Sequence, residues 1–525
     1  MVKDTTTTVE DTSTTTVEKN KSHVTIIFVA LILTMLMSSL GQMIFATALP
    51  TIVGELGGVN HMSWVISAFL LAQTCAMPII GKLGDMTGRK HIFLAGIAAF
   101  MVGSILGAIT QSMGLLIAAR ALQGFAAGTL MVSSQAIIAE VIPARQRGKY
   151  MGIMGAVFGL NSVLGPVIGG WLTDGPGWRW GMWINVPLGL IALFVSARYL
   201  RLPRRSMEAR YDVLGTVFLV IAASTLILTT TWGGTQYEWT SPTIMTLIAV
   251  SIVAWISLYF VERRASAPLI PVELFRVRNF SLTTVAGLAL GIAMFGTMAY
   301  LPTYLQMVHG MTPTNAGLMM TPMMVGMLLT SISVGNLISR TGKYRWYPPV
   351  GMTIMGIALY LMSTLQASTS LVTVGIYLFI MGFGLGLGMQ VLVLVVQNSF
   401  PVAMVGTATA ANNFFRQIGG AVGSSVVGAI FIHRMESLVQ ERLPQAMARV
   451  QQSAPSADAT PVDPSALHSM TPAILDKLPA PIHDVFVTSY NDGLAPVFLM
   501  LVPLMAFSVL LLLFVKEDAL KETIE

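Results

Sequence analysis

Residues 81–90 read GKLGDMTGRK, with three glycines, one acid and three bases set between two long apolar runs. Residues 62–80 precede this segment and residues 92–110 follow it, and each run is long enough to cross a roughly 30 Å hydrocarbon core as a helix. Bases collect in the cytoplasmic loops of membrane proteins. The segment therefore predicts a short cytoplasmic turn between two membrane spans.

The residue types in this turn favour a breakable contact, or latch. Asp85 can accept hydrogen bonds from the N-terminal amides of a helix, and it can pair with Arg89 or Lys90. Gly81 and Gly88 allow close backbone approach or a positive φ. The alternative is an ordinary basic turn that only sets the membrane topology.

The composition is that of an integral membrane protein. Of the 525 residues, 54% are hydrophobic and 10% are charged, and the mean hydropathy is +0.72, whereas about 25% of the residues in soluble domains are charged. The net charge of +6 does not indicate nucleic-acid binding, because the bases lie mostly in short loops between apolar runs. Cys75 is the only cysteine, so no internal disulfide, metal site or cofactor is expected.

Fourteen apolar runs have the length of a membrane-spanning helix. They are residues 24–49, 62–80, 92–110, 115–142, 150–173, 182–200, 213–232, 243–260, 280–308, 315–338, 348–365, 370–398, 405–432 and 494–515. An even number places both chain ends on one side, and most of the 30 Lys and Arg residues lie in the tails and loops of that side. We expect an all-α, multi-pass protein of the cytoplasmic membrane with both termini in the cytoplasm.

A weak internal repeat divides these spans. Residues 335–345, GNLISRTGKYR, end the tenth span much as residues 81–90 end the second, although they lack the acid. Parallel six-helix repeats suit an alternating-access transporter. The expected parts are a disordered cytoplasmic tail at 1–22, a six-helix half at 23–200, inserted helices seven and eight at 201–262, a second six-helix half at 263–516 and a cytoplasmic tail at 517–525.

The second half contains one long segment between its last two spans. Residues 433–492 are rich in Pro, Ala, Ser and Asp and predict a partly ordered extracellular loop. Two interpretations stay open for it, a tolerated insertion and a docking or lid element.

Arg120 lies well inside an apolar run. Residues 116–124 read LIAARALQG, which places Arg120 and Gln123 one helical turn apart on the same face. An intramembrane arginine usually faces a bundle interior or a watery cavity. Snorkelling of Arg120 toward the outer membrane surface is the alternative.

The fifth span combines small residues with a proline. Gly165, Pro166, Gly169 and Gly170 follow several earlier glycines, so small residues recur at helical spacing and one backbone donor is missing in mid-helix. These residues predict either a hinge or static close packing.

Polar side chains inside other apolar runs are candidates for lining a substrate cavity. Arg416 lies near the middle of its span with Asn413 on the same helix, and helix–helix hydrogen bonding is the alternative interpretation. The full candidate set is Gln42, Gln135, Asn161, Gln390, Asn413 and Arg416.

Several of these motifs resemble those of one family. Residues 81–90 resemble the loop motif of the major facilitator superfamily between its second and third helices, and residues 120–124, RALQG, resemble its fourth-helix motif. Residues 164–170, LGPVIGG, resemble the fifth-helix motif that exporters of the superfamily share. The stretches WRWGMWINVP, WGGTQYEWTSP, PLIPVELF and NNFFRQIGG resemble the fourteen-helix drug:proton antiporters.

The resemblance implies a major facilitator fold and roles for named residues. Asp85, Arg89 and Lys90 would help to lock an outward-facing state, and Arg120 would take part in coupling. One position departs from the family pattern, because Gly41 stands where family members often carry a first-helix acid. Proton coupling is therefore an implication of the resemblance alone.

The expected function is secondary active efflux of amphiphilic drugs or toxic hydrophobic compounds by proton antiport and alternating access. Export of a lipid or a siderophore-like metabolite is the alternative within the transporters. A membrane sensor or channel is the hypothesis from a different functional class. The sequence has no G-x-x-x-x-G-K-[ST] motif and no HExxH motif, so neither an ATP-driven pump nor a membrane enzyme is expected. If Arg120 and Arg416 face one cavity, dicationic substrates are disfavoured.

Overall fold

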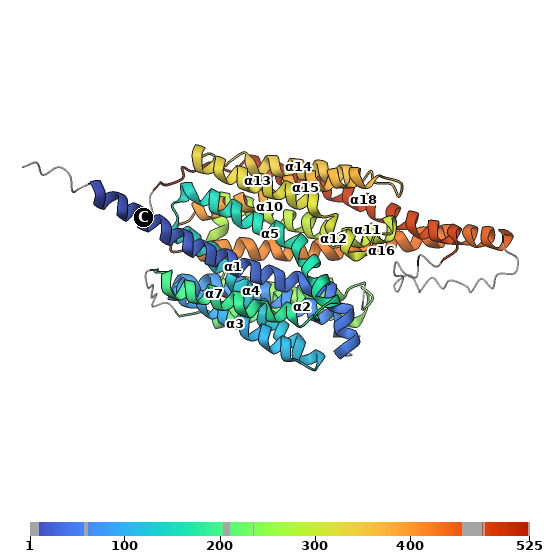
Figure 1. Cartoon of the computed structure of the whole chain (residues 1–525), viewed down its shortest axis with the longest axis horizontal. Coiled ribbons are helices and arrows are strands. Elements are labelled where there is room, and N and C mark those ends of the chain that lie inside the picture. Colours follow the sequence, from blue (N-terminus) through green and yellow to red (C-terminus); the bar gives the residue numbers. More distant parts are fainter. Residues whose placement is uncertain are drawn as a thin grey trace, which may run out of the picture.

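The computed structural model describes residues 10–56, 61–202, 210–234, 236–453, 475 and 478–522. Within these residues the backbone is a bundle of long helices without strands (Figure 1). The start of α1 and the C-terminus lie at the same end of the bundle (Figure 1). Asp85 lies at this end, which we call the Asp85 end.

The first group of helices consists mainly of uninterrupted apolar segments. Its members are α1 (Glu10–Leu56), α2 (Met62–Thr87), α3 (Arg89–Ile109), α4 (Met113–Val141), α5 (Ala144–Asp174), α6 (Trp180–Trp183) and α7 (Asn185–Tyr199). α2 packs on α4, and α1 packs on α5 and α7.

The second group follows the helix pair α8 (Val213–Trp232) and α9 (Pro242–Glu262), which we call the inserted hairpin. After the 3₁₀ helix η2 (Val272–Arg276) come α10 (Arg278–Met298), α11 (Leu301–His309), α12 (Pro313–Leu318), α13 (Thr321–Thr341), α14 (Tyr347–Met362), α15 (Leu371–Asn398), α16 (Val405–Ser453) and α18 (Ala480–Leu513). α10 packs on α16, and α15 packs on α13 and α14.

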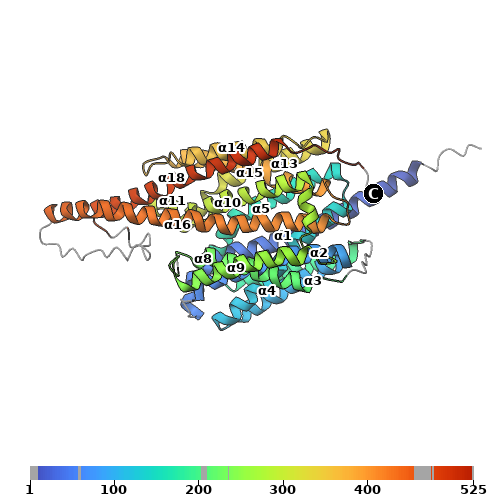
Figure 2. The same cartoon turned by 180° about the vertical axis from the view of Figure 1, so that it is seen from behind.

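Two pairs of helices make the most extensive contacts between the groups. α2 contacts α16, and α5 contacts α13; we call these the α2–α16 seam and the α5–α13 seam. The inserted hairpin lies beside α16 (Figure 2), and α8 contacts both α2 and α16. The α2–α16 seam is therefore covered on one side by a third element.

The all-helical membrane fold predicted from the sequence is confirmed. Twelve helices of the described part are long and apolar enough to cross a membrane. The remaining two predicted spans correspond to α5 and to the shorter apolar helix α14, which run in the same bundle (Figure 1).

Two predicted boundaries differ from the structure. Residues 81–90 do not form a loop, because α2 continues to Thr87, α3 begins at Arg89, and only Gly88 with φ of 93° separates them. Likewise, α1 begins at Glu10, so the part of the expected disordered tail from residue 10 onward is helical, while residues 1–9 lie outside the described part. A helix that has formed in a span lengthens at little cost, since each added residue brings one more backbone hydrogen bond.

The predicted loop at 433–492 is also largely helical at its ends. α16 continues to Ser453 and α18 begins at Ala480, and both project beyond the other helices (Figure 1). Apolar side chains at helical spacing, among them Val439, Leu443 and Phe486, are buried. We call this helix pair the extension; residues 454–474 lie outside the described part.

Candidate functional site

Asp85 forms the centre of a polar contact in the α2–α16 seam. Its Oδ2 atom accepts a hydrogen bond from the Thr407 backbone amide at 2.7 Å and another from the Thr407 hydroxyl at 2.8 Å. Thr407 lies in the first turn of α16, where unpaired amides and the helix dipole favour an anion. Asp85 is 4% exposed. A buried carboxylate of the first group therefore caps the N-terminus of α16 in the second group.

Arg89 holds the other carboxylate oxygen of Asp85. The Nη2–Oδ1 distance is 2.8 Å, and the same Nη2 donates to the Val402 carbonyl, just before α16. Arg89 Nη1 donates to the Ala136 carbonyl and, at 3.1 Å, to Glu140 of α4. Arg89 therefore connects α2, α4 and the start of α16 through one buried guanidinium.

The other predicted latch residues have different roles. At Gly81 an added Cβ would lie 2.4 Å from the Ala410 Cβ and 2.9 Å from the Gly406 carbonyl oxygen, so the glycine lets α2 and α16 approach closely. Gly88 supplies the positive φ between α2 and α3. Lys90 donates to the Ala197 carbonyl of α7, so within the described residues it is bound to the first group and not to Asp85.

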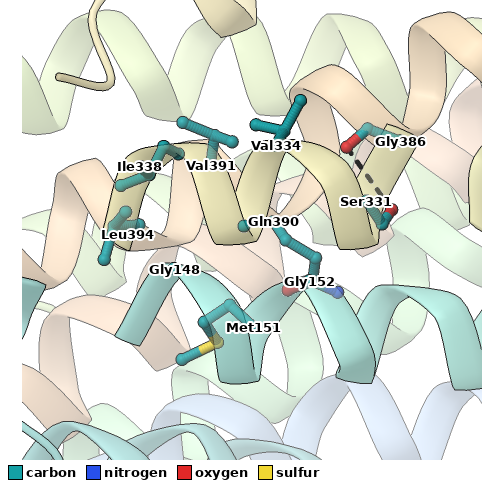
Figure 3. A pocket seen from close by; sticks show the side chains of 11 residues that line it. Gly148, Met151, Gly152, Ser331, Val334, Ile338, Gly386, Gln390, Val391 and Leu394 are labelled. Atoms are coloured by element: carbon teal, nitrogen blue, oxygen red, sulfur yellow. Dashed lines mark hydrogen bonds between the residues drawn. The ribbon is translucent and has the colours of Figure 1, made fainter. Parts of the chain in front are cut away.

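Glycines, not charges, dominate the α5–α13 seam. An added Cβ at Gly152 would lie 2.2 Å from the Ser331 carbonyl oxygen, and one at Gly335 would lie 2.4 Å from the Gly148 carbonyl oxygen. Figure 3 shows this contact with Gln390 of α15 beside it and the Ser331–Gly386 hydrogen bond. The space between these residues is only about 10 Å³, too small for any ligand.

A cation caps this second seam at the Asp85 end. Arg145, in the first turn of α5, donates to the carbonyls of Ser339 and Arg340 in the last turn of α13. It also pairs with Glu522. A cation is favoured at the C-terminus of a helix, so this contact is the electrostatic counterpart of Asp85 at the N-terminus of α16.

The predicted hinge lies in the second half of α5. Gly165 and Gly169 are buried, as either a hinge or close packing requires. The side chain of Pro166 and the position of Gly170 relative to its neighbours lie outside the described part. The hinge stays a prediction.

Arg120 is buried within the first group, at 1% exposure. Its guanidinium lies 4.4 Å from the Phe45 ring centroid and 4.2 Å from that of Phe69. It donates to the Gly41 and Val65 carbonyls and to Gln123, whose amide donates to Ser104. Aromatic faces and carbonyl oxygens thus compensate the cation in place of a carboxylate.

Three predicted cavity residues form a cluster between α4 and α16. Asn413 donates to Gln135 Oε1 at 2.6 Å and accepts a hydrogen bond from Arg416, and all three are buried. This is the helix–helix hydrogen bonding named as the alternative. Within the described part, Arg416 Nη1 and Gln135 Nε2 have no partner.

Arg120 and Arg416 do not share a cavity in this conformation. Arg120 contacts α1 and α2, whereas Arg416 contacts its own helix near α4. The premise that both cations face one cavity is therefore not met. Asn161 of α5 and Gln390 of α15 are buried elsewhere in the bundle, and Gln390 packs against Gly155 of α5.

A cavity of about 130 Å³ lies on the α2–α16 seam, toward the extension from the latch. Gln42 is the predicted substrate residue that lines it. Its walls come from five helices, α1, α2, α8, α10 and α16, and include Gln42, Ser67, Leu70, Thr74, Ile227, Thr231, Phe295, Gln417, Gly420, Ala421 and Ser424. None of the described residues that line this cavity is charged.

Several residues of these contacts were missed in the sequence. Thr407 lies 322 positions from Asp85, and no local pattern connects the two. Glu140 was not identified as a partner of Arg89, and the cavity residues on α8 were treated as part of an insertion. The one usable signal for Thr407 is its position in the first turn of a predicted span.

The chain matches the family model described as Major Facilitator Superfamily over residues 31–424. A relative in Mycobacterium tuberculosis, an uncharacterized MFS-type transporter, is 39% identical over 95% of this chain and 70% of its own length. The multidrug transporter protein MdtP of Bacillus subtilis is 34% identical over 88% of this chain and 83% of its own length.

A solved structure of similar fold is that of the proton:xylose symporter XylE, with a TM-score of 0.60 and 12% identity. The match covers 96% of this chain and 98% of that one. At this identity the likeness concerns the fold alone.

Proposed function

The chain belongs to the major facilitator superfamily, and we propose on that premise that it exports amphiphilic drugs or toxic hydrophobic compounds by alternating access, driven by proton antiport. The observation that carries the proposal is the contact between Asp85 and the first turn of α16. This contact joins the two helix groups at the Asp85 end of the α2–α16 seam. The cavity of about 130 Å³ lies farther along the same seam.

The latch has the properties of a reversible lock. Its hydrogen bonds between α2 and α16 are few and depend on one carboxylate, so a single change of charge weakens all of them together. In the state described here the Asp85 end is closed. Release of the latch would let α2 and α16 separate at that end, and the cavity would then open to the Asp85 side of the membrane.

The positions of Lys and Arg residues and the family motifs support a direction of transport and an orientation in the membrane. Arg145, Lys149, Arg201, Arg264 and Lys343 lie at or near the Asp85 end in the sequence order of the spans, which favours a cytoplasmic position for that end and for both termini. The exporter-like motif at residues 164–170 and relatives named as multidrug transporters support efflux. The membrane is then the cytoplasmic membrane.

Proton coupling requires a group that titrates. Asp85 and Glu140 both lie against Arg89, and protonation of Asp85 would remove one charge of that pair. We propose that proton binding at this contact favours release of the latch, and that Arg120 and Gln123 hold the first group rigid during the change.

Purified protein in proteoliposomes with an internal pH indicator tests the proposal. Addition of a neutral amphiphile should move protons in the direction opposite to the substrate, and the movement should stop with Asp85→Asn. Substrate movement without proton movement would contradict the antiport. Rapid uncoupled flux that shows no counterflow would instead indicate a channel.

A further inference from the structure

The inserted hairpin is part of the core of the α2–α16 seam. Leu219 and Ala223 of α8 and Leu258 of α9 are buried in one apolar cluster with Cys75 of α2 and Ala411 of α16. Figure 2 shows the hairpin running along α16. One face of the hairpin is therefore packed into the seam, while its other face, with Val213 and Val253, is exposed.

Aromatic contacts connect the hairpin to both helices of the seam. Trp232 of α8 packs edge-on against Trp64 of α2, with ring centroids 5.3 Å apart. Trp255 of α9 packs against Phe414 of α16 at 6.2 Å. Any separation of α2 from α16 must change at least one of these contacts.

The cavity on the seam uses the hairpin as a wall. Ile227 and Thr231, one turn apart on α8, face a space that is lined from the other side by Gln417 of α16 and Gln42 of α1. Ile227 is 3% exposed. Within the described residues, the carboxamides of Gln42 and Gln417 have no hydrogen-bond partner.

We propose that this hairpin-walled cavity binds an aromatic ring of an uncharged amphiphile, and that Ile227 and Thr231 of the inserted hairpin determine which substrates fit. The inference rests on the proposed function, and it assigns the inserted helices a direct part in substrate selection.

Size and charge favour this class of ligand. A dry cavity of about 150 Å³ is known to hold a benzene molecule, and the volume here is about 130 Å³. Leu70, Ile227 and Phe295 supply apolar surface, while the carboxamides of Gln42 and Gln417 supply donors and acceptors. A cationic group has no carboxylate partner among the lining residues, so its burial is unfavourable.

The test uses three ligands that share a pendant phenyl ring and differ in charge: neutral 6-phenylphenanthridine, monocationic ethidium and dicationic propidium. Equilibrium binding to the purified full chain is measured by ligand fluorescence, and transport is measured in proteoliposomes. We expect binding to weaken at least tenfold from the neutral to the dicationic ligand. Tighter binding of propidium would overturn the inference.

Variants locate the site. Ile227→Phe fills the cavity and should weaken binding of 6-phenylphenanthridine about tenfold, whereas Val217→Phe, on the same helix at an exposed position, should change it less than twofold. Gln417→Leu nearly preserves the side-chain volume and should weaken binding about threefold, which keeps the test decisive if Ile227→Phe does not fold.

The two readouts separate the two proposals. Binding with the expected variant pattern but without transport supports the cavity and overturns the exporter. Transport that is insensitive to Ile227→Phe and Gln417→Leu supports the exporter and overturns the hairpin-walled cavity. Absence of binding by all three ligands also overturns the cavity.

Discussion

The two seams that join the helix groups use opposite ends of the helix dipole. At the α2–α16 seam a buried carboxylate, Asp85, caps the N-terminus of α16; at the α5–α13 seam a half-exposed guanidinium, Arg145, caps the C-terminus of α13. A carboxylate can lose its charge by binding a proton, whereas an arginine stays charged in proteins. We propose that protons switch the first seam, whereas the second seam is held mainly by close glycine contacts.

The largest effect is expected at the α5–α13 seam, where glycines allow close helix packing. Gly152→Leu places a bulky side chain where even a Cβ would lie 2.2 Å from the Ser331 carbonyl oxygen. Overpacking of this kind costs about 1–3 kcal/mol or more, so folded protein and transport should both be lost. Thermal unfolding and transport measure this, with Gly114→Leu as the control, because nothing lies within 4 Å of Gly114. Normal transport by Gly152→Leu would show that α5 and α13 do not need to touch.

The next effect concerns the switchable seam. Asp85→Asn removes the charge that Arg89 and the α16 amide bind, while Arg89 keeps Glu140 and two carbonyls. A charged hydrogen bond contributes about 1.5–3 kcal/mol, so turnover should fall roughly 10- to 100-fold with little change in the amount of folded protein. Asp484→Asn, on an exposed acid of α18, is the matched control. Wild-type turnover by well-folded Asp85→Asn would remove the latch assignment.

A smaller effect is expected from the partner of Asp85. Thr407→Val removes the hydroxyl hydrogen bond of 2.8 Å and leaves the backbone one of 2.7 Å. The loss of one such bond costs about 0.5–1.5 kcal/mol, so turnover should fall two- to tenfold. Thr407→Ser, which keeps the hydroxyl, should behave as wild type. If Thr407→Val and Thr407→Ser are equally impaired, the hydroxyl is not the cause.

The smallest effect is expected from Arg145→Gln. The Arg145 side chain is 39% exposed and its partner Glu522 is 69% exposed, and exposed pairs contribute less than about 1 kcal/mol. Transport should stay within about fivefold of wild type, and its pH dependence should not change. A larger loss than that of Asp85→Asn would reverse the assignment of the two seams.

The sequence predicts one side of the latch better than the other. Asp85 was expected to meet the N-terminal amides of a helix, because its charge sits among glycines at the end of a span. Thr407 could not be named, because pairing between residues 322 positions apart is set by the packing of whole helices. The loop expected between α2 and α3 is absent for a different, local reason, because a helix that has formed lengthens at little cost and only Gly88 separates the two.

The sequence predicted whether a side chain is buried more reliably than which neighbouring helix it faces. Arg120 and Arg416 are both buried, as their places within apolar runs require, but helical periodicity does not tell which neighbour a face meets in a large bundle. Arg120 lies between two aromatic rings and Arg416 beside Asn413. The hairpin side of the cavity was missed for the same reason, since α8 is apolar nearly all around and shows no distinct face.

The helix α16 spans 49 residues, from the turn that meets Asp85 to the tip of the extension, and contains Pro444 within the extension. At 1.5 Å per residue it is about 70 Å long. If it tilts as a rigid rod about the Asp85 end, a rotation of about 10° moves its far tip by about 12 Å. The extension thus acts as a lever arm that magnifies a small event on one side of the membrane into a displacement on the other, where an attached spin label or a bound antibody can follow or arrest it.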